Sequence, residues 1–141
     1  MTAPSPVHAS CVDLDGQGVL ITGASGRGKS TLALALIGQG ARLVADDRVA
    51  LVRTGETVTA TRPPGLPPLI EARGLGLLHA PLCSATVLAL VVDLDTPETE
   101  RLPPLRHTSV LGCAIPLIYR GEGLDFGFHL ALMLRHGRGA P

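Results

Sequence analysis

The sequence predicts an α/β fold in a single domain, and three observations support this. Short hydrophobic runs with many β-branched residues alternate with segments rich in helix-forming residues, which is typical of α/β proteins. The chain has 141 residues, of which 45% are hydrophobic, and this is enough for one core. A glycine-rich stretch joins a buried strand to an apolar helix. We therefore expect one domain over residues 7–136, with disordered tails at 1–6 and 137–141.

The first expected elements are a β-hairpin and a helix. Val7–Leu14 alternates loosely and ends at an Asp-Gly turn, and Gly18–Thr22 then follows as a short apolar strand. Lys29–Gln39 contains strong helix formers and is apolar on nearly all sides, so it predicts a buried helix that closes at Gly38 and Gly40. A strand, a loop and a helix are thus expected to follow one another near the N-terminus.

Strands dominate the middle of the chain. Arg42–Ala45 predicts a strand directly after the helix, while Val49–Arg53 and Glu56–Thr61 predict a hairpin around a Thr-Gly turn. Residues 62–68 contain four prolines and a glycine, so they must form a loop.

A strand, a loop and a helix are expected from Val87 onward. Val87–Leu94 predicts a buried strand from its length and β-branched content. Asp95–Leu105 is polar and contains three prolines, which is typical of a surface loop. Leu124–His136 predicts a short amphipathic helix.

The composition argues against several classes of function. The 12 basic and 12 acidic residues give a formal net charge of zero, and no run of Lys and Arg marks a surface for nucleic acid or anionic lipid. Aromatic residues make up 2% of the chain, too few for base-stacking platforms. Affinity for a partner must therefore come from a local site, and we expect no nucleic-acid partner.

The N-terminus and the cysteines favour the cytoplasm. Met1–Pro6 has neither the basic nor the apolar region of a signal peptide, and no apolar stretch approaches the roughly 20 residues that cross a bilayer. Cys11, Cys83 and Cys113 are odd in number and far apart, which fits reduced, buried thiols better than disulfides or a metal site. We expect a cytoplasmic protein without membrane contact.

Residues 23–30 carry the strongest chemical signal. They read GASGRGKS, which satisfies GxxxxGK[ST], and they lie between a buried strand and a helix, as that motif requires. In such a loop the backbone N–H groups and the helix N-terminus hold phosphate oxygens. Lys29 is expected to reach the β- and γ-phosphates, and the Ser30 hydroxyl to bind Mg²⁺. The competing interpretation is a glycine-rich turn with a surface lysine. The candidate nucleotide-binding residues are Gly23, Ala24, Ser25, Gly26, Arg27, Gly28, Lys29, Ser30 and Thr31.

Carboxylates that end two strands are the next candidates. Asp46 and Asp47 follow one strand and Asp93 ends another, so each is placed to act as a metal ligand. Adjacent strand residues point to opposite sides, so Asp46 and Asp47 are not expected to share one role. A carboxylate that accepts the proton of a substrate hydroxyl is what a kinase requires. The alternatives are a turn cap for Asp46 or Asp47, and a plain strand end for Asp93 and Asp95.

Five segments in the same order make the sequence similar to HPr kinase/phosphorylase, the bacterial enzyme that phosphorylates a serine of the phosphocarrier protein HPr. They are His8 in VHASCVDLDG, the stretch GVLITGASGRGKSTLALALI, the acidic pair in ARLVADD, IEARGLGL at Ile70–Leu77, and Arg101 with the following leucine. The resemblance covers roughly Val7–Met133. It implies a P-loop domain with a mixed sheet of the kind found in phosphoenolpyruvate carboxykinase.

The resemblance also implies roles at the phosphate and metal site. Lys29 and the loop amides would hold the phosphates of ATP, and Ser30 and Glu71 would bind Mg²⁺. The phosphorylated partner would be HPr or a close paralogue. Longer relatives are hexamers, so the resemblance allows a homo-oligomer and leaves the oligomeric state open.

Further residues would act on the transferred group. The resemblance implies that Asp47 takes the serine proton, that Asp46 supports the site, and that His8 lies near the reacting phosphate. Arg73 and Arg101 would offset charge in the transition state. These roles agree with the general chemistry of phosphoryl transfer, which relies on positioning and charge neutralisation.

Departures from the family pattern bear on whether the chain catalyses phosphorylation, the forward reaction, or dephosphorylation, the reverse reaction. Ala24 stands where an acid is usual and Thr31 where Glu is frequent, and we expect no match to the regulatory N-terminal domain of long members within these 141 residues. In IPLIYRGEG, residues 115–123, Arg120 is the one cation kept from the basic segment tied to dephosphorylation. The forward kinase reaction is therefore favoured. The alternatives are a nucleotide-binding regulatory module without catalysis, and a small-molecule kinase or GTPase.

Overall fold

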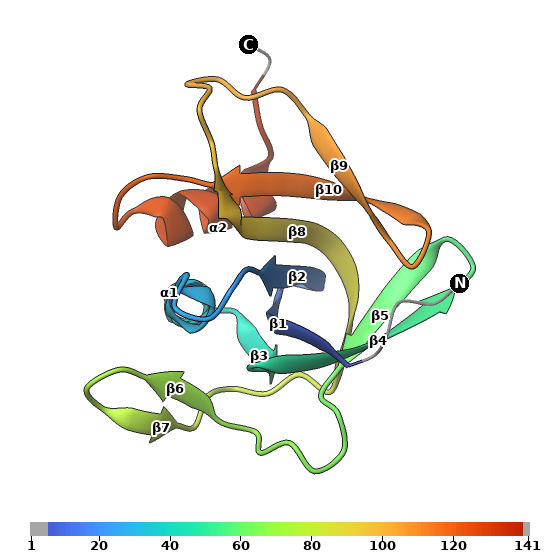
Figure 1. Ribbon diagram of the computed structural model, residues 1–141, viewed down its shortest axis with the longest axis vertical. Coiled ribbons are helices and arrows are strands. Elements are labelled where there is room, and N and C mark those ends of the chain that lie inside the picture. The colour runs from blue at the N-terminus through green and yellow to red at the C-terminus, as the bar shows by residue number, and fades with distance from the viewer. Residues whose placement is uncertain (1–5, 140–141) are drawn as a thin grey trace.

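The computed structural model describes residues 6–139, so residues 1–5 and 140–141 of the two expected tails lie outside the described residues. Over that range the chain forms ten strands and two helices (Figure 1). The strands are β1 Val7–Leu14, β2 Gln17–Thr22, β3 Arg42–Ala45, β4 Arg48–Thr54, β5 Thr57–Thr61, β6 Ile70–Ala72, β7 Gly76–Leu78, β8 Ala85–Pro97, β9 Arg106–Val110 and β10 Cys113–Arg120. The helices are α1 Lys29–Gly38 and α2 Phe126–His136.

Eight strands form one mixed sheet, which agrees with the expected α/β fold and with the mixed sheet that the resemblance implies. Along the sheet the order is β2-β1-β4-β5-β8-β10-β9, with β3 paired to β1 and a further pairing between β2 and β8. β8 runs parallel to both β2 and β10, whereas the other pairs in this sheet are antiparallel. β6 and β7 form a separate hairpin beside α1 (Figure 1).

The core lies on both sides of β2 and β8. Val19 and Ile21 of β2 pack in a cluster with α1 and α2, whereas Leu20 belongs to a second cluster that includes β4 and β5. Successive side chains of a strand point to opposite faces, so β2 is buried on both. This explains why its sequence is almost continuously apolar. The structure thus confirms the expected buried strand.

β8 is longer than the sequence predicts. Val87–Leu94 was the expected strand and Asp95–Leu105 the expected loop, but β8 continues to Pro97. Its last residues stay in the sheet because Arg120 of β10 pairs with Pro97 across a register shift. The loop therefore begins after Pro97, and the expectation for residues 95–97 is wrong.

Two hairpins have weak sequence signals. The strands β6 and β7 have three residues each, which is too short for a periodic pattern. The strands β9 and β10 meet at a turn in which Leu111 has φ 49°, a conformation that leucine rarely adopts. Pro116 within β10 also argues against a strand, yet β10 pairs with β8 and β9 along its length.

The three cysteines agree with the expected reduced thiols. Cys11, Cys83 and Cys113 are free and buried, and burial raises the pKa of the Cys11 thiol well above its ordinary range. Across residues 6–139, no helix has both the length and the apolar character needed to cross a membrane.

Two glycines in helices test how closely α1 and α2 pack. A Cβ added at Gly127 of α2 would lie 2.6 Å from the Ala35 Cβ of α1, whereas a Cβ at Gly38 meets nothing within 4 Å. We predict that Gly127→Ala lowers the free energy of unfolding by about 1–3 kcal/mol because the helices must separate. Gly38→Ala, the matched control, should leave it unchanged or raise it by up to about 1 kcal/mol. Urea unfolding measures both, and equal effects would contradict the close packing.

Candidate active site

The glycine-rich loop connects β2 to α1 and leaves the helix N-terminus open. Gly28 is the N-cap of α1 with φ 95°, a left-handed conformation that glycine adopts without strain. The Leu32 N–H donates to the Gly28 carbonyl, which starts the helix. In the part of the chain that the structure describes, no side chain caps α1. The N–H groups of its first turn are therefore available to an anionic ligand.

Lys29 is held inside the loop. Its ammonium donates to the Gly23 carbonyl at 2.7 Å, and the residue is 9% exposed. A buried cation that contacts the first residue of its own loop is not a surface lysine. The environment of Lys29 therefore does not support the competing interpretation of residues 23–30 as a plain glycine-rich turn with a surface lysine.

Asp46 is the centre of a hydrogen-bond network. The Ser30 hydroxyl donates to Asp46 at 2.9 Å and 3.2 Å, and the Ser10 hydroxyl donates to Asp46 Oδ1 at 2.6 Å. The Glu71 backbone N–H lies 3.4 Å from Asp46 Oδ2. Ser10 is fully buried, and sequence reasoning missed it because a lone serine in a strand carries no motif. Asp46 is thus fixed from β1, α1 and β6 at once.

Asp47 has different partners from Asp46. Its carboxylate lies 3.5 Å from His8 Nδ1, with 62% of the Asp47 side chain exposed. The Ala9 N–H donates to the Asp47 carbonyl. His8 and Ser10 are two positions apart in β1, so their side chains lie on the same face of the strand, and this face contacts both aspartates.

The two aspartates nevertheless face the same cavity. We expected adjacent residues of a strand to point to opposite sides. Asp47 departs from this pattern because it has φ 74°, so the chain turns there instead of continuing the strand. The expectation of opposite sides is wrong, although the two carboxylates do have distinct environments.

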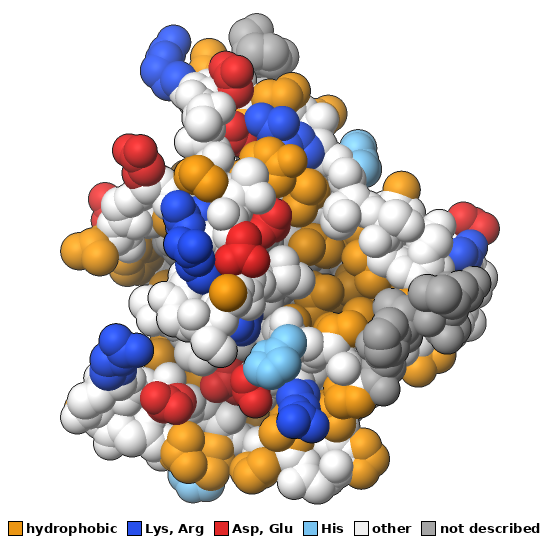
Figure 2. Space-filling view, viewed as in Figure 1, with side chains coloured by type: hydrophobic (Ala, Val, Ile, Leu, Met, Phe, Trp, Pro, Cys, Tyr) orange, Lys and Arg blue, Asp and Glu red, His pale blue; other side chains and the backbone are white. Residues whose placement is uncertain are grey.

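A cavity of about 680 Å³ collects most of the candidate residues. The candidates that line it come from the loop, from α1, from the acidic pair and from the β6–β7 hairpin, and Figure 2 shows acidic and basic side chains around a hollow at this position. They are Ser25, Gly26, Gly28, Lys29, Ser30, Thr31, Asp46, Asp47, Glu71 and Arg73. Apolar residues that sequence reasoning missed complete the lining, namely Leu66, Pro67, Leu69 and Leu77. The cavity therefore combines a cationic loop, carboxylates and an apolar rim.

The oxygen donors fit Mg²⁺ bound together with a nucleotide. Ser30 and Asp46 place a hydroxyl and a carboxylate side by side. Mg²⁺ usually takes one or two protein carboxylates, phosphate oxygens and several waters. Residues 6–139 contain no group of three or more His, Cys, Asp and Glu able to hold a metal alone. The exposed side chain of Glu71 lines the same cavity, and its expected role as a ligand stays a prediction.

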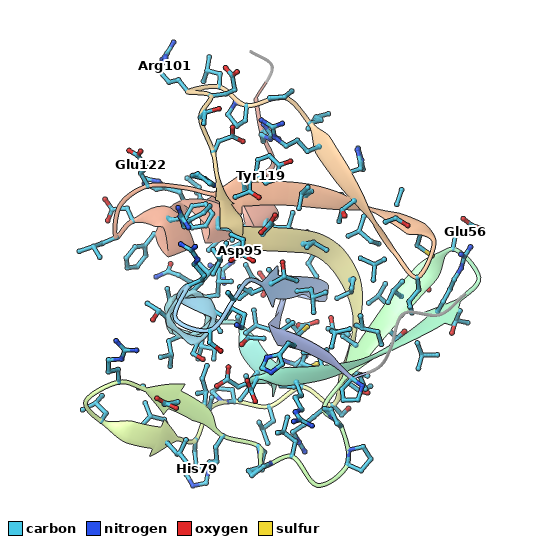
Figure 3. The ribbon with its side chains drawn as sticks, in the orientation of Figure 1. Glu56, His79, Asp95, Arg101, Tyr119 and Glu122 are labelled. Carbon is cyan, nitrogen blue, oxygen red and sulfur yellow. The ribbon has the colours of Figure 1, made fainter. Side chains whose placement is uncertain are left out.

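Arg101 lies elsewhere. It lines a second cavity of about 580 Å³ between the β8–β9 loop and α2, and in Figure 3 it points away from α1. Arg106 holds this loop: it pairs with Glu98 at 3.0 Å and lies over the Tyr119 ring. The Glu100 backbone N–H and, to a smaller extent, Arg106 keep the pKa of Glu98 below its ordinary range. Within one chain Arg101 thus does not line the cavity that contains Lys29, Asp46 and Asp47.

The end of β8 touches the back of the loop. Asp95 Oδ1 accepts the Ala24 N–H at 3.0 Å and lies 3.4 Å from Arg27 Nε. Asp93 accepts the Asp95 N–H and the Thr96 hydroxyl. The alternative of a plain strand end fits neither aspartate, because β8 continues to Pro97 and Asp95 contacts the loop.

The fold and the site define an α/β protein with a mixed sheet, in which a strand, a GxxxxGK[ST] loop and a helix face an acidic pair. The family described as HPr Serine kinase C-terminal domain matches residues 1–101. The chain belongs to this family.

Individual relatives agree with this membership. The HPr kinase/phosphorylase of Cupriavidus metallidurans is 43% identical over 124 residues, which are 79% of this chain and 38% of the relative. That of Lacticaseibacillus casei is 42% identical over 102 residues, 65% of this chain and 32% of the relative. The chain thus spans about a third of these relatives. The solved HPr(Ser) kinase/phosphatase from Coxiella burnetii matches with a TM-score of 0.77 and 25% identity, over 94% of this chain and 95% of that chain.

The backbone of Asp47 offers a test of strain at the site. A left-handed conformation costs an ordinary residue about 1–2 kcal/mol, and glycine avoids this cost. We predict that Asp47→Gly raises the free energy of unfolding by about 0.5–1 kcal/mol, after the entropy cost of glycine is subtracted. Asp47→Ala is the matched control, because it also removes the His8 contact but keeps the Cβ. If thermal and urea unfolding rank alanine as stable as glycine, the strain is absent.

Proposed function

We propose that this chain is an ATP-dependent kinase that transfers the γ-phosphoryl group of ATP to a serine hydroxyl of an HPr-type phosphocarrier protein. The observation that carries the proposal is the convergence of Lys29, Ser30, Asp46 and Asp47 on one cavity. Membership of the HPr serine kinase C-terminal family supports the same reaction. So do the names of the relatives, HPr kinase/phosphorylase and HPr(Ser) kinase/phosphatase.

The loop side of the cavity would bind and orient ATP. The backbone N–H groups of the loop and the first turn of α1 would donate to phosphate oxygens, and Lys29 would exchange its bond to the Gly23 carbonyl for one to the β- and γ-phosphates. Ser30 and Glu71 would hold Mg²⁺ with Asp46 beside them, and the ion would neutralise charge on the phosphate oxygens. Ser10 keeps the Asp46 carboxylate in place through a bond on its inner side.

The acidic side would act on the protein substrate. Asp47 would accept the proton of the serine hydroxyl while the serine oxygen forms a bond to the γ-phosphorus and the bond from that phosphorus to ADP breaks. The exposure of Asp47 leaves it open to a substrate loop, and the His8 contact holds it. Arg73 lines the same cavity and would offset charge on the transferred group.

The forward reaction suits these residues better than the reverse one. Arg120, the one cation in residues 115–123, donates to the Leu94 carbonyl and is not among the residues that line the cavity. That bond ties it to the end of β8. We therefore propose that phosphorylation of HPr dominates over phosphate-dependent dephosphorylation.

The direct test is phosphorylation of purified HPr with radiolabelled ATP and Mg²⁺. We predict incorporation by the wild-type chain, and a loss of about 100-fold or more in Lys29→Ala and Asp47→Asn, because they remove phosphate binding and the base. Asp15→Asn, which changes an exposed aspartate in the β1–β2 turn, is the matched control and should retain activity. Equal activity of Asp47→Asn and wild type would refute the assigned base. ATP binding without any transfer would instead support the regulatory-module alternative.

Ser10 allows a test of the Asp46 network. Ser10→Ala removes one donor to Asp46 and leaves the Ser30 bond. Because loss of a group that orients a metal ligand typically weakens the metal 10–100-fold, we predict a rise of roughly 10-fold in the Mg²⁺ needed for half-maximal nucleotide binding. Ser109→Ala, in an exposed position of β9, is the control. An unchanged Mg²⁺ requirement would show that Ser10 is not needed to orient Asp46.

A further inference from the structure

The contact between Asp95 and the glycine-rich loop is not explained by the proposed catalytic roles. Asp95 lies at the end of β8, beside the loop that precedes α1 (Figure 3). A single oxygen, Oδ1, accepts the Ala24 N–H and lies near Arg27 Nε. One carboxylate therefore joins two residues of the loop to the sheet.

Neither of the two loop residues that Asp95 contacts lines the cavity. The residues of the loop and of the first turn of α1 that line it are Ser25, Gly26, Gly28, Lys29, Ser30 and Thr31. Ala24 and Arg27, the partners of Asp95, are absent from that lining. Asp95 thus contacts the side of the loop that faces away from the cavity. The loop residues that line the cavity remain available to a ligand.

The backbone at Asp95 is held by neighbouring contacts, whereas the Asp95 side chain is 50% exposed. Its backbone N–H donates to Asp93, and Asp93 also accepts the Thr96 hydroxyl. Arg120 donates to the carbonyl of Leu94, the residue before Asp95. Thr22, the last residue of β2, pairs with Asp93 in the parallel ladder. The strand that ends in the loop and the strand that carries Asp95 are therefore joined immediately before the contact.

We propose that Asp95 is a positioning residue that orders the phosphate-binding loop before a nucleotide arrives. A flexible glycine-rich loop loses conformational entropy when it closes on phosphates, and a loop that is already ordered loses less. The carboxylate is also an anion close to an anion-binding loop, and its pairing with Arg27 offsets that charge. The inference rests on the proposed function in one respect, namely that the loop binds nucleotide phosphates.

Three substitutions separate the contributions of Asp95. Asp95→Asn keeps Oδ1 as an acceptor for the Ala24 N–H and removes the charge. Asp95→Ala removes both the acceptor and the charge. Arg27→Ala leaves the carboxylate on the amide without its cationic partner. Asp15→Asn, remote and exposed, again serves as the control.

The experiment measures ADP binding by calorimetry and exchange of the Ala24 amide by NMR in the full chain. We expect Asp95→Ala to raise the Kd for ADP about 5- to 10-fold and to speed Ala24 exchange, with Asp95→Asn within about 2-fold of wild type in both. Arg27→Ala should raise the Kd with little change in Ala24 exchange. A role in global stability alone would not move amide exchange at one loop residue selectively.

The outcomes are distinct from those of the kinase assay. Wild-type affinity and wild-type Ala24 exchange in Asp95→Ala overturn this inference, and so does an equal loss of affinity in Asp95→Ala and Asp95→Asn. If Asp95→Ala does not fold, the comparison of Asp95→Asn with Arg27→Ala decides: an Asp95→Asn chain with fast Ala24 exchange overturns it. ADP binding by the wild type without transfer to HPr contradicts the proposed function and leaves the Asp95 result standing.

Discussion

The parallel pairing of β2 with β8 fixes the position of the functional site. Thr22 pairs with Asp93, so the carboxyl ends of the two strands lie at one edge of the sheet. In α/β sheets ligands bind outside such ends, where the following loops meet. β2 continues there into the glycine-rich loop, and β8 supplies Asp95 to its back. The pairing is robust because both strands are buried on two faces, against α1 and α2 on one side and against β4 and β5 on the other.

The second constraint is the concentration of carboxylates beside a loop suited to anions. Asp46 is stabilised by neutral donors, the hydroxyls of Ser10 and Ser30 and a backbone N–H, rather than by a cation. Asp47 stands beside His8, whereas Lys29 contacts only the loop carbonyl at Gly23 among the bonds described. A site arranged in this way keeps its lysine unpaired with acid, so that a phosphate can compete for it. Positive charge at the loop and negative charge at the acidic pair are thus held apart within one cavity.

The parts that the sequence predicted are those with a local pattern. GxxxxGK[ST] between a strand and a helix located the loop, and the apolar runs located β1, β2, α1 and β3 within one or two residues. By contrast, no local sequence pattern tells which residues of distant strands a side chain will contact. Ser10 is an ordinary serine until the fold places Asp46 beside it, and Asp95 resembles a strand end until β8 is extended by pairing with β10. Arg101 fits a sequence pattern, yet the loop that carries it is held away by Glu98 and Arg106. Tertiary pairing, not propensity, decided each of these cases.

The backbone at Asp47 illustrates how this site departs from what stability alone would select. A left-handed aspartate costs free energy, and glycine would occupy the position at lower cost. The turn lets adjacent residues serve one cavity, since a regular strand would direct one carboxylate to each face. The chain gains two carboxylates with different partners, one fixed by hydroxyls next to Ser30 and one exposed beside His8. The left-handed backbone at Asp47 thus accompanies the placement of two consecutive carboxylates in one cavity.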